Sequence, residues 1–150
     1  MRQKAFTMVE LMLVVVLLAI GFGFVVLFTQ TSQVRADINT QAASLVSDLR
    51  LSQSNAFAGK STQSYGLHLE TSGYTVFVGS TYDLNDPSNY VVSFPPNLEV
   101  QNISLNGGGS SVIFDPPHGK TDEYGSFDLV STALGKTIII TINPLGSVDY

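Results

Sequence analysis

The 150-residue sequence contains no cysteine and no tryptophan, and only 13% of its residues are charged. Without cysteine, the chain forms no disulfide and no thiolate metal site, and it has no cysteine nucleophile. The charged share is about half of that in an ordinary soluble domain. Because 44% of the residues are hydrophobic, a disordered chain is also excluded. The length suits one ordinary domain, or a smaller domain with an appendage.

Basic residues are scarce in the second part of the chain. Seven Lys and Arg stand against twelve Asp and Glu, which gives a net charge of −5. Residues 61–150 contain only Lys120 and Lys136 as basic residues, against nine acidic ones. A nucleic-acid-binding protein needs a basic face that contacts phosphates and releases counterions. We therefore expect no nucleic-acid partner, and no DNA binding by residues 29–150.

A long apolar run stands near the amino terminus. Residues 11–28 read LMLVVVLLAIGFGFVVLF and contain no charge and no amide side chain. As a helix, at about 1.5 Å per residue, the run would span roughly 27 Å, which is just enough to cross a bilayer. Arg2 and Lys4 precede it, so the positive-inside rule places the amino terminus in the cytoplasm. We predict a single-pass protein of the cytoplasmic membrane with an extracytoplasmic carboxyl-terminal domain.

Three interpretations of this run remain open. A secretory signal peptide would be cleaved after Val34-Arg35-Ala36, but the apolar run exceeds the roughly 15 residues of such signals. A plain signal anchor fits the length but leaves Glu10 unexplained. A carboxylate near the head of a membrane helix costs up to about 3 kcal/mol and usually marks a function. The third interpretation comes from the residues around Glu10.

The segment KAFTMVELM at residues 4–12 resembles the amino terminus of the type IV prepilins. That family has a short basic leader ending in a small residue, usually Gly, and then Phe, three mostly apolar or hydroxyl residues, Glu and an apolar helix. Here Ala5 stands where Gly is usual, Phe6 follows, and Glu10 has the spacing of the family's Glu. The resemblance implies that a prepilin peptidase cleaves between Ala5 and Phe6 and that the new amine of Phe6 is methylated. It also implies assembly into a filament, in which the Glu10 carboxylate meets the Phe6 amine of a neighbouring subunit.

The apolar pattern continues at helical spacing beyond this run. Spacings of mostly three, four or seven residues indicate a helix with one face on a core. The residues of this stripe are Val34, Ile38, Ala42, Leu45, Leu49, Ala56 and Phe57. We predict one helix over about residues 6–58, with a transmembrane half at 6–28 and an amphipathic half at 29–59 after a leader at 1–5. Gly21 and Gly23 are expected points of bending or local melting, although glycine is also common in membrane helices.

From residue 60 onward, short alternating runs separated by Gly, Pro, Asn and Asp indicate antiparallel sheet. Residues 137–142 are expected to form a strand that is buried on both faces near its middle. The predicted fold is α+β, with the long helix laid on an antiparallel β-sheet domain at residues 60–150. The expected strands are Tyr65–Leu69, Tyr74–Val78, Tyr90–Phe94, Leu98–Leu105, Val112–Phe114, Phe127–Val130, Lys136–Asn143 and Val148–Tyr150.

The carboxyl-terminal part resembles the GspH/FimT pseudopilins. The residues that carry this resemblance are FDPPHGKTDEYGSFDLVS at 114–131 and GKTIIITINPLGSVDY at 135–150. The basic residues that the family has around its last Gly turn are replaced here by Ser147 and Asp149. The resemblance implies a pilin-like fold and a minor pseudopilin of a type II secretion pseudopilus or related type IV pilus. The implied partners are prepilin peptidase, other pilins, the inner-membrane assembly platform and the lipid bilayer. A membrane-anchored binding module and a DNA-uptake pilus subunit remain alternatives.

No catalytic motif emerges from the sequence. Gly119-Lys120-Thr121 and Gly135-Lys136-Thr137 resemble the end of a phosphate loop but lack its earlier glycine. His68 and His118 lie about fifty residues apart, without metal-ligand spacing around them. We expect no enzymatic activity, no cofactor and no metal. A calcium site is the one alternative, because a single loop gathers several hard oxygen ligands, although such loops are usually turns. These ligands are Asp83, Asn85, Asp86 and Asn89.

Overall fold

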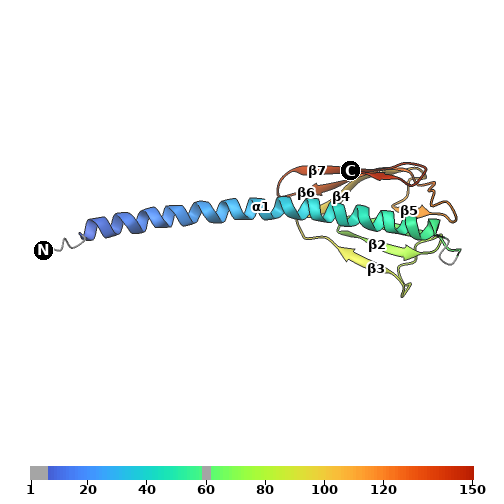
Figure 1. Cartoon of the computed structure of the whole chain (residues 1–150), viewed down its shortest axis with the longest axis horizontal. Coiled ribbons are helices and arrows are strands. Elements are labelled where there is room, and N and C mark those ends of the chain that lie inside the picture. The colour runs from blue at the N-terminus through green and yellow to red at the C-terminus, as the bar shows by residue number, and fades with distance from the viewer. Residues whose placement is uncertain (1–6, 59–61) are drawn as a thin grey trace.

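The computed structural model describes the backbone of residues 7–58 and 62–150, and the side chains of these residues except 24–36. The described chain begins with the helix α1 (Met8–Phe57), and eight strands follow. Figure 1 shows the first half of α1 projecting away from the β strands, while its second half lies along them. We call the part of α1 that precedes Ile38, the first residue of this helix described as buried, the stem, and the part from Ile38 onward the second half.

The helix α1 begins at Met8, because Thr7 has an extended backbone and caps it. The Thr7 hydroxyl accepts a hydrogen bond from the Glu10 N–H at 3.3 Å, which satisfies one of the free donors of the first turn. The helix runs unbroken through Gly21 and Gly23, so the predicted local melting there is wrong. Each glycine costs about 1 kcal/mol relative to alanine but keeps both backbone hydrogen-bonding groups. The helical residues on either side therefore keep Gly21 and Gly23 in the helix despite this cost.

The strands form two antiparallel sheets, whereas the sequence predicted one. The first sheet has the order β3-β2-β1-β5, and the second has the order β4-β6-β7-β8. The predicted hairpin of β1 and β2 is present, with Glu70 opposite Gly73. Alternating apolar residues indicate strands but do not show which strands pair. The division into two sheets could therefore not be predicted from the sequence. The bounds are β1 (Tyr65–Glu70), β2 (Gly73–Val78), β3 (Tyr90–Ser93), β4 (Leu98–Leu105), β5 (Ser111–Phe114), β6 (Gly125–Ser131), β7 (Lys136–Ile142) and β8 (Val148–Asp149).

One hydrophobic core lies where the second half of α1 meets both sheets (Figure 1). The predicted stripe is largely confirmed, because its members from Ile38 to Ala56 are all fully buried. Phe57 is 67% exposed, so its place in the stripe was wrong. Ala56 continues the buried face of Leu49 and Ser52 at spacings of seven and four, and Phe57, about 100° further round the helix, falls outside that face. The side chain of Val34 lies outside the described residues.

The strand β7 is buried on one face only. Ile140 and Ile142 are buried, whereas Ile139 is 59% exposed and Thr141, between the two buried residues, is also exposed. The expected burial on both faces is therefore wrong. The reason is that the helix covers one face of the second sheet, and the strand then alternates between core and solvent.

Candidate functional site

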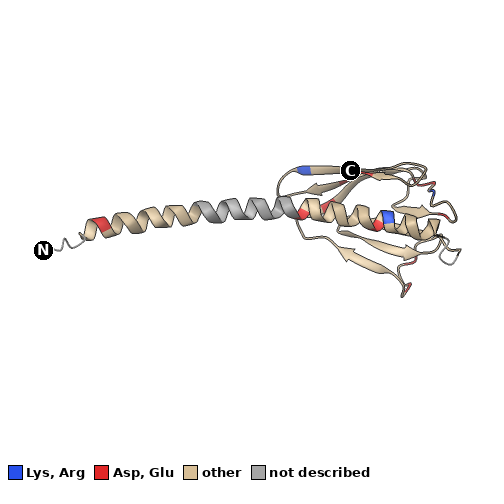
Figure 2. Ribbon diagram, in the orientation of Figure 1, with Lys and Arg blue, Asp and Glu red and all other residues tan. Residues whose placement is uncertain are grey.

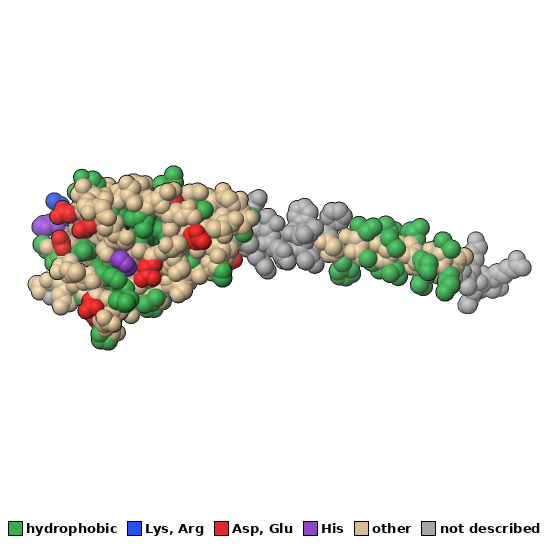
Figure 3. All heavy atoms as spheres, turned by 180° about the vertical axis from the view of Figure 1, so that it is seen from behind, with side chains coloured by type: hydrophobic (Ala, Val, Ile, Leu, Met, Phe, Trp, Pro, Cys, Tyr) green, Lys and Arg blue, Asp and Glu red, His purple; other side chains and the backbone are tan. Residues whose placement is uncertain are grey.

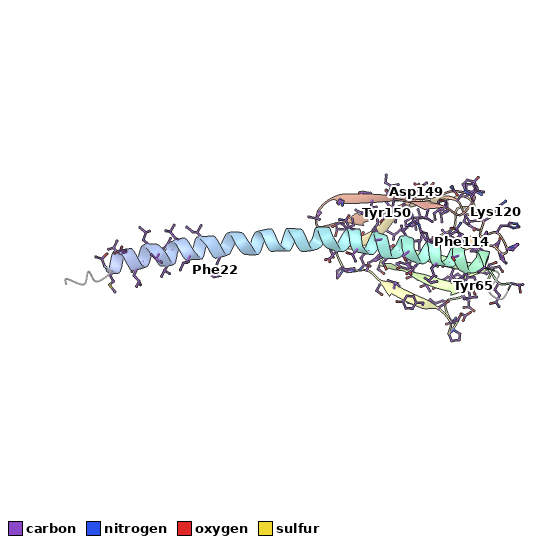
Figure 4. The ribbon with its side chains drawn as sticks, in the orientation of Figure 1. Phe22, Tyr65, Phe114, Lys120, Asp149 and Tyr150 are labelled. Atoms are coloured by element: carbon purple, nitrogen blue, oxygen red, sulfur yellow. The ribbon has the colours of Figure 1, made fainter. Side chains whose placement is uncertain are left out.

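The stem exposes apolar side chains that a folded domain would normally bury. Every described side chain from Thr7 to Gly23 is exposed. The large hydrophobic ones range from 46% exposed at Val14 to 81% at Met8. Figure 4 shows Phe22 standing on the stem, away from the β strands. Because contiguous apolar surface of this kind marks a contact with membrane or protein, the stem is the candidate functional site.

Part of the predicted site lies outside what the structure describes. The leader charges Arg2 and Lys4 and the processing pair Ala5 and Phe6 fall in residues 1–6, which are outside the described residues. The predicted span 11–28 also includes residues 24–28, whose side chains are not among the described ones. Within the part of the chain that could be searched, no helix is long and apolar enough to cross a membrane.

Glu10 lies in the first turn of α1, with its side chain exposed. The partial positive charge of a helix amino terminus favours a carboxylate at this position. Figure 2 shows how sparse charge is along the described stem. If the stem were surrounded by apolar groups, a carboxylate there would require a cationic or hydrogen-bonding partner. Glu10 therefore stands where a charged group of another chain can meet it.

Polar side chains on the second half of α1 anchor it to the first sheet. The Tyr74 hydroxyl of β2 donates a hydrogen bond to Asp48 Oδ2 at 2.7 Å. Burial, followed by this bond to Asp48, raises the pKa of the Tyr74 hydroxyl. The bond joins a carboxylate of the helix to the interior of the sheet, so it opposes sliding or rotation of α1 on β2.

Other side chains of α1 hold the carboxyl-terminal strand and its loops. Arg50 donates to the Val148 carbonyl at 2.8 Å. The Gln53 amide donates to the carbonyls of Leu145 at 3.0 Å and Gly119 at 3.3 Å, and thus joins two loops. Gly146 has a φ of +84°, and a Cβ there would collide with the Gly119 carbonyl and the Gln53 amide. Glycine is therefore required at this close approach.

These anchors could not be predicted from the sequence, because their partners lie far away along the chain. Arg50 and Gln53 occupy polar positions of an amphipathic helix, where a solvent-exposed side chain is the usual expectation. Gly146 indicated a turn in the sequence, but not that Gln53 would approach it. The anchors hold the second half of α1 against both sheets.

The outward face of the first sheet carries a smaller cluster around His68. The His68 ring stacks on Tyr82, with centroids 4.1 Å apart, and its Nδ1 shares a 2.8 Å hydrogen bond with Ser111 Oγ. Burial lowers the pKa of His68, and the charge of Glu70 acts weakly in the opposite direction. Across the described residues, no carboxylate bonds the second ring nitrogen, as a Ser-His-acid triad would require. The cluster therefore serves to hold Tyr82 and its loop on the sheet.

Two of the predicted calcium ligands, Asp83 and Asp86, accept hydrogen bonds within their own loop, whereas Asn89 Oδ1 is buried without a hydrogen-bond partner among the described residues. Asp83 Oδ1 accepts from the Asn85 N–H at 2.9 Å, and the Asp83 carbonyl accepts from the Asn89 amide at 2.7 Å. Asp86 Oδ1 accepts from the N–H and the hydroxyl of Ser88, and these bonds lower the pKa of Asp86. In the residues described, no three His, Asp or Glu come together as a metal site. The loop thus has turn chemistry.

The two lysines of residues 61–150 lie at opposite ends of the β domain. Figure 4 shows Lys120 at the end farthest from the stem. Lys136 begins β7 at the stem end, where its Nζ donates to Asn39 Oδ1 at 2.9 Å. The fold therefore does not combine the two into one basic patch.

The comparisons with known proteins concern the amino-terminal segment. Residues 1–26 match the family model of the prokaryotic N-terminal methylation motif. No curated protein matches the chain, and no solved structure matches it. The matched segment includes Glu10 and most of the described stem. It supports a type IV prepilin-like protein, with pilin-type processing and assembly.

Proposed function

We propose that the chain is a minor pseudopilin of the GspH/FimT type, in a type II secretion pseudopilus or a related type IV pilus. Its precursor is held in the inner membrane, cut by prepilin peptidase between Ala5 and Phe6, and methylated on the Phe6 amine. The observation that carries this proposal is the division of α1 into an exposed apolar stem and a buried, anchored second half. A filament subunit needs both, because the stem makes contacts outside the chain while the second half carries the β domain.

The stem surface suits two successive environments. In the precursor, its apolar side chains contact lipid, and in the filament they contact the stems of neighbouring subunits. Both environments exclude water from the same residues, so exchanging one for the other exposes little apolar surface. Packing and polar contacts then decide whether a subunit leaves the bilayer.

Glu10 supplies the polar contact in this proposal. Its carboxylate pairs with the Phe6 amine of a neighbouring subunit, because a charge inside an apolar bundle is stable only when it is paired. The pair also sets the axial register of one stem against the next, since no other acidic side chain lies in the first turn. Cleavage is a precondition, because it creates the amine at Phe6.

A structural role is also supported by the chemistry of the β domain. The histidine cluster, the acidic loop and the helix anchors all form contacts that hold loops or strands together. The absence of cysteine excludes the disulfide-closed terminal loop of many major pilins, which favours a pseudopilin over an adhesive major subunit. We propose no enzymatic activity, cofactor or nucleic-acid partner.

The Glu10→Val variant tests the proposal. It removes the charge and improves membrane insertion by at most about 3 kcal/mol. We expect normal processing and an intact β domain, but loss of the protein from a sheared filament fraction detected with an antibody. Val9→Ile, one residue away on the exposed stem, is the matched control and should assemble normally. Assembly of Glu10→Val at the wild-type level would contradict the proposal and favour a plain anchor.

A gel shift separates the secretion role from DNA uptake. Non-specific affinity for DNA comes from phosphate contacts, and the two lysines at opposite ends of the domain provide few of them. We expect no complex between the protein and duplex DNA at about micromolar concentration and near-physiological salt. A shift under these conditions would overturn the secretion role in favour of DNA uptake.

A further inference from the structure

The strand β3 (Tyr90–Ser93) is an open edge of the first sheet. It pairs with β2 on one side, and Figure 1 shows it at the margin away from the second sheet. The Phe94 N–H donates to the Ser72 carbonyl at 2.8 Å, so the backbone groups of Phe94 and Val92 face β2. Alternation along the strand then turns the N–H and C=O groups of Val91 and Ser93 outward.

This short edge strand, YVVS, carries no charge and no proline that would prevent strand pairing. Tyr90 and Val91 are each 64% exposed, and Leu84 in the preceding loop is 73% exposed. Natural edge strands are commonly protected by Lys, Pro or a bulge, and an unprotected apolar edge is a template for a further strand. The edge therefore offers both backbone groups and apolar contacts.

Carboxylates lie in the loop before the edge strand, and no basic residue accompanies them in this part of the sequence. Residues 61–119 contain no Lys or Arg. The Asn89 amide holds the Asp83 carbonyl beside the start of β3, and the bonds from Ser88 keep Asp86 ionised in the same loop. Glu70 ends β1, two strands further into the sheet, and is not part of this edge. The face in Figure 3 shows acidic and hydrophobic side chains together, with blue confined to the end opposite the stem.

We propose that the outer edge of β3 is a docking site for an extended segment of another protein, with apolar β-branched residues next to a Lys or Arg. The segment adds a strand to the first sheet through the backbone groups of Val91 and Ser93. Its apolar side chains contact Val91, and its basic end faces Asp83 and Asp86 in the loop before β3. A second copy of this chain fits less well, because its residues 61–119 supply no Lys or Arg to meet these carboxylates. The inference concerns the β domain and is independent of the proposed assembly through the stem.

Nuclear magnetic resonance of the full chain in detergent micelles tests this inference. The probe is a blocked peptide, Lys-Thr-Val-Thr-Val-Thr-Lys, and its control has both Lys replaced by Glu. We expect the Lys peptide to shift the amide signals of Val91 and Ser93 and to slow their hydrogen exchange, because these groups become bonded. The Glu peptide should leave both signals unchanged.

Two sets of variants separate the backbone and charge contributions. Val91→Pro removes an outward N–H without removing a bond to β2, and we expect at least about tenfold weaker binding of the peptide. Val91→Thr keeps the N–H and a β-branched side chain and should bind as the wild type does. The double variant Asp83→Asn, Asp86→Asn should weaken binding while leaving the amide signals of the second sheet in place.

Several results would overturn the inference. These are no binding, shifts confined to other strands, equal binding of the Lys and Glu peptides, or unchanged binding by the Val91→Pro and Asp83→Asn, Asp86→Asn variants. Concentration-dependent changes at β3 without peptide would identify a second copy as the occupant and would also overturn it. If Val91→Pro disturbs the signals of the second sheet, the charge variants decide the outcome.

Discussion

The two halves of α1 have opposite relations to the rest of the chain. In the stem, apolar side chains such as Leu17 and Leu18 are more than half exposed, whereas Leu45 and Leu49 in the second half are fully buried. One continuous helix thus has an apolar stem that packs against no other described part of the chain, and a second half that packs into the core. Burial in the second half is accounted for by this chain, while the apolar character of the stem is accounted for only by something outside it. The β domain should therefore depend strongly on the second half and little on the stem.

The largest expected effect comes from removing the second half of the helix. A fragment of residues 29–150 should fold as a monomer, because it keeps the buried helix face and about 120 residues suffice for a core. A fragment of residues 62–150 should not unfold cooperatively, because it leaves both sheets open where α1 packs. Circular dichroism during thermal unfolding measures this. A cooperative transition in the shorter fragment, or none in the longer one, would contradict the claim that the β domain depends on the second half of α1 and not on the stem.

A single leucine in each half sharpens the contrast. Leu49→Ala should lower the free energy of unfolding of the β domain by about 2–5 kcal/mol, because it opens a cavity in the core. Leu18→Ala in the stem should change it by less than about 0.5 kcal/mol, because its side chain has no partner in the chain. Urea unfolding of both variants in detergent gives the two values. Equal effects would show that the stem contributes to the fold of the β domain.

The Tyr74–Asp48 hydrogen bond should have a smaller effect than the buried leucine. Tyr74→Phe keeps the ring but leaves the Asp48 carboxylate without this donor, which should cost about 1–3 kcal/mol in urea unfolding. Tyr90→Phe is the matched control, because Tyr90 is 64% exposed and its change should be close to neutral. A neutral Tyr74→Phe variant would mean that apolar packing alone anchors the helix.

The smallest expected effect is a pH dependence from His68. Its pKa in the folded chain lies below the unfolded value of 6.5, so the folded state binds fewer protons than the unfolded state. This contribution to stability is fully present above pH 6.5 and is lost as the pH falls below that value. Urea midpoints about one unit above and one unit below 6.5 should differ more in the wild type than in His68→Gln. An unchanged difference in His68→Gln would assign the dependence to other groups.

The sequence predicted features with a repeating or rare signal. The apolar residues from Ile38 to Ala56 recur at spacings of three, four and seven, which are typical of one face of an α-helix. The strand bounds could be predicted from alternating apolar residues and from turn residues. Glu10 stood out because a carboxylate beside an apolar run is costly. Errors occurred where the outcome depends on neighbours from elsewhere in the chain, as for Ile139, whose outer face received no covering element.

The contacts that were missed share one property, which is that each joins distant segments. Gln53 bonds carbonyls 66 and 92 residues away, and His68 meets Ser111 only because β1 pairs with β5. Neither residue type nor spacing indicates such partners before the strand order is known. The division into two sheets has the same origin, since pairing is decided by packing against α1.

Mass spectrometry of the protein extracted from membranes tests the central claim most directly. The account predicts that Met1–Ala5 are absent and that the chain begins at Phe6, with the added mass of one methyl group on its amine. Because the peptidase acts before assembly, the Glu10→Val variant should show the same terminus. An intact Met1, or a terminus at Asp37 after cleavage of a signal peptide, would contradict the account.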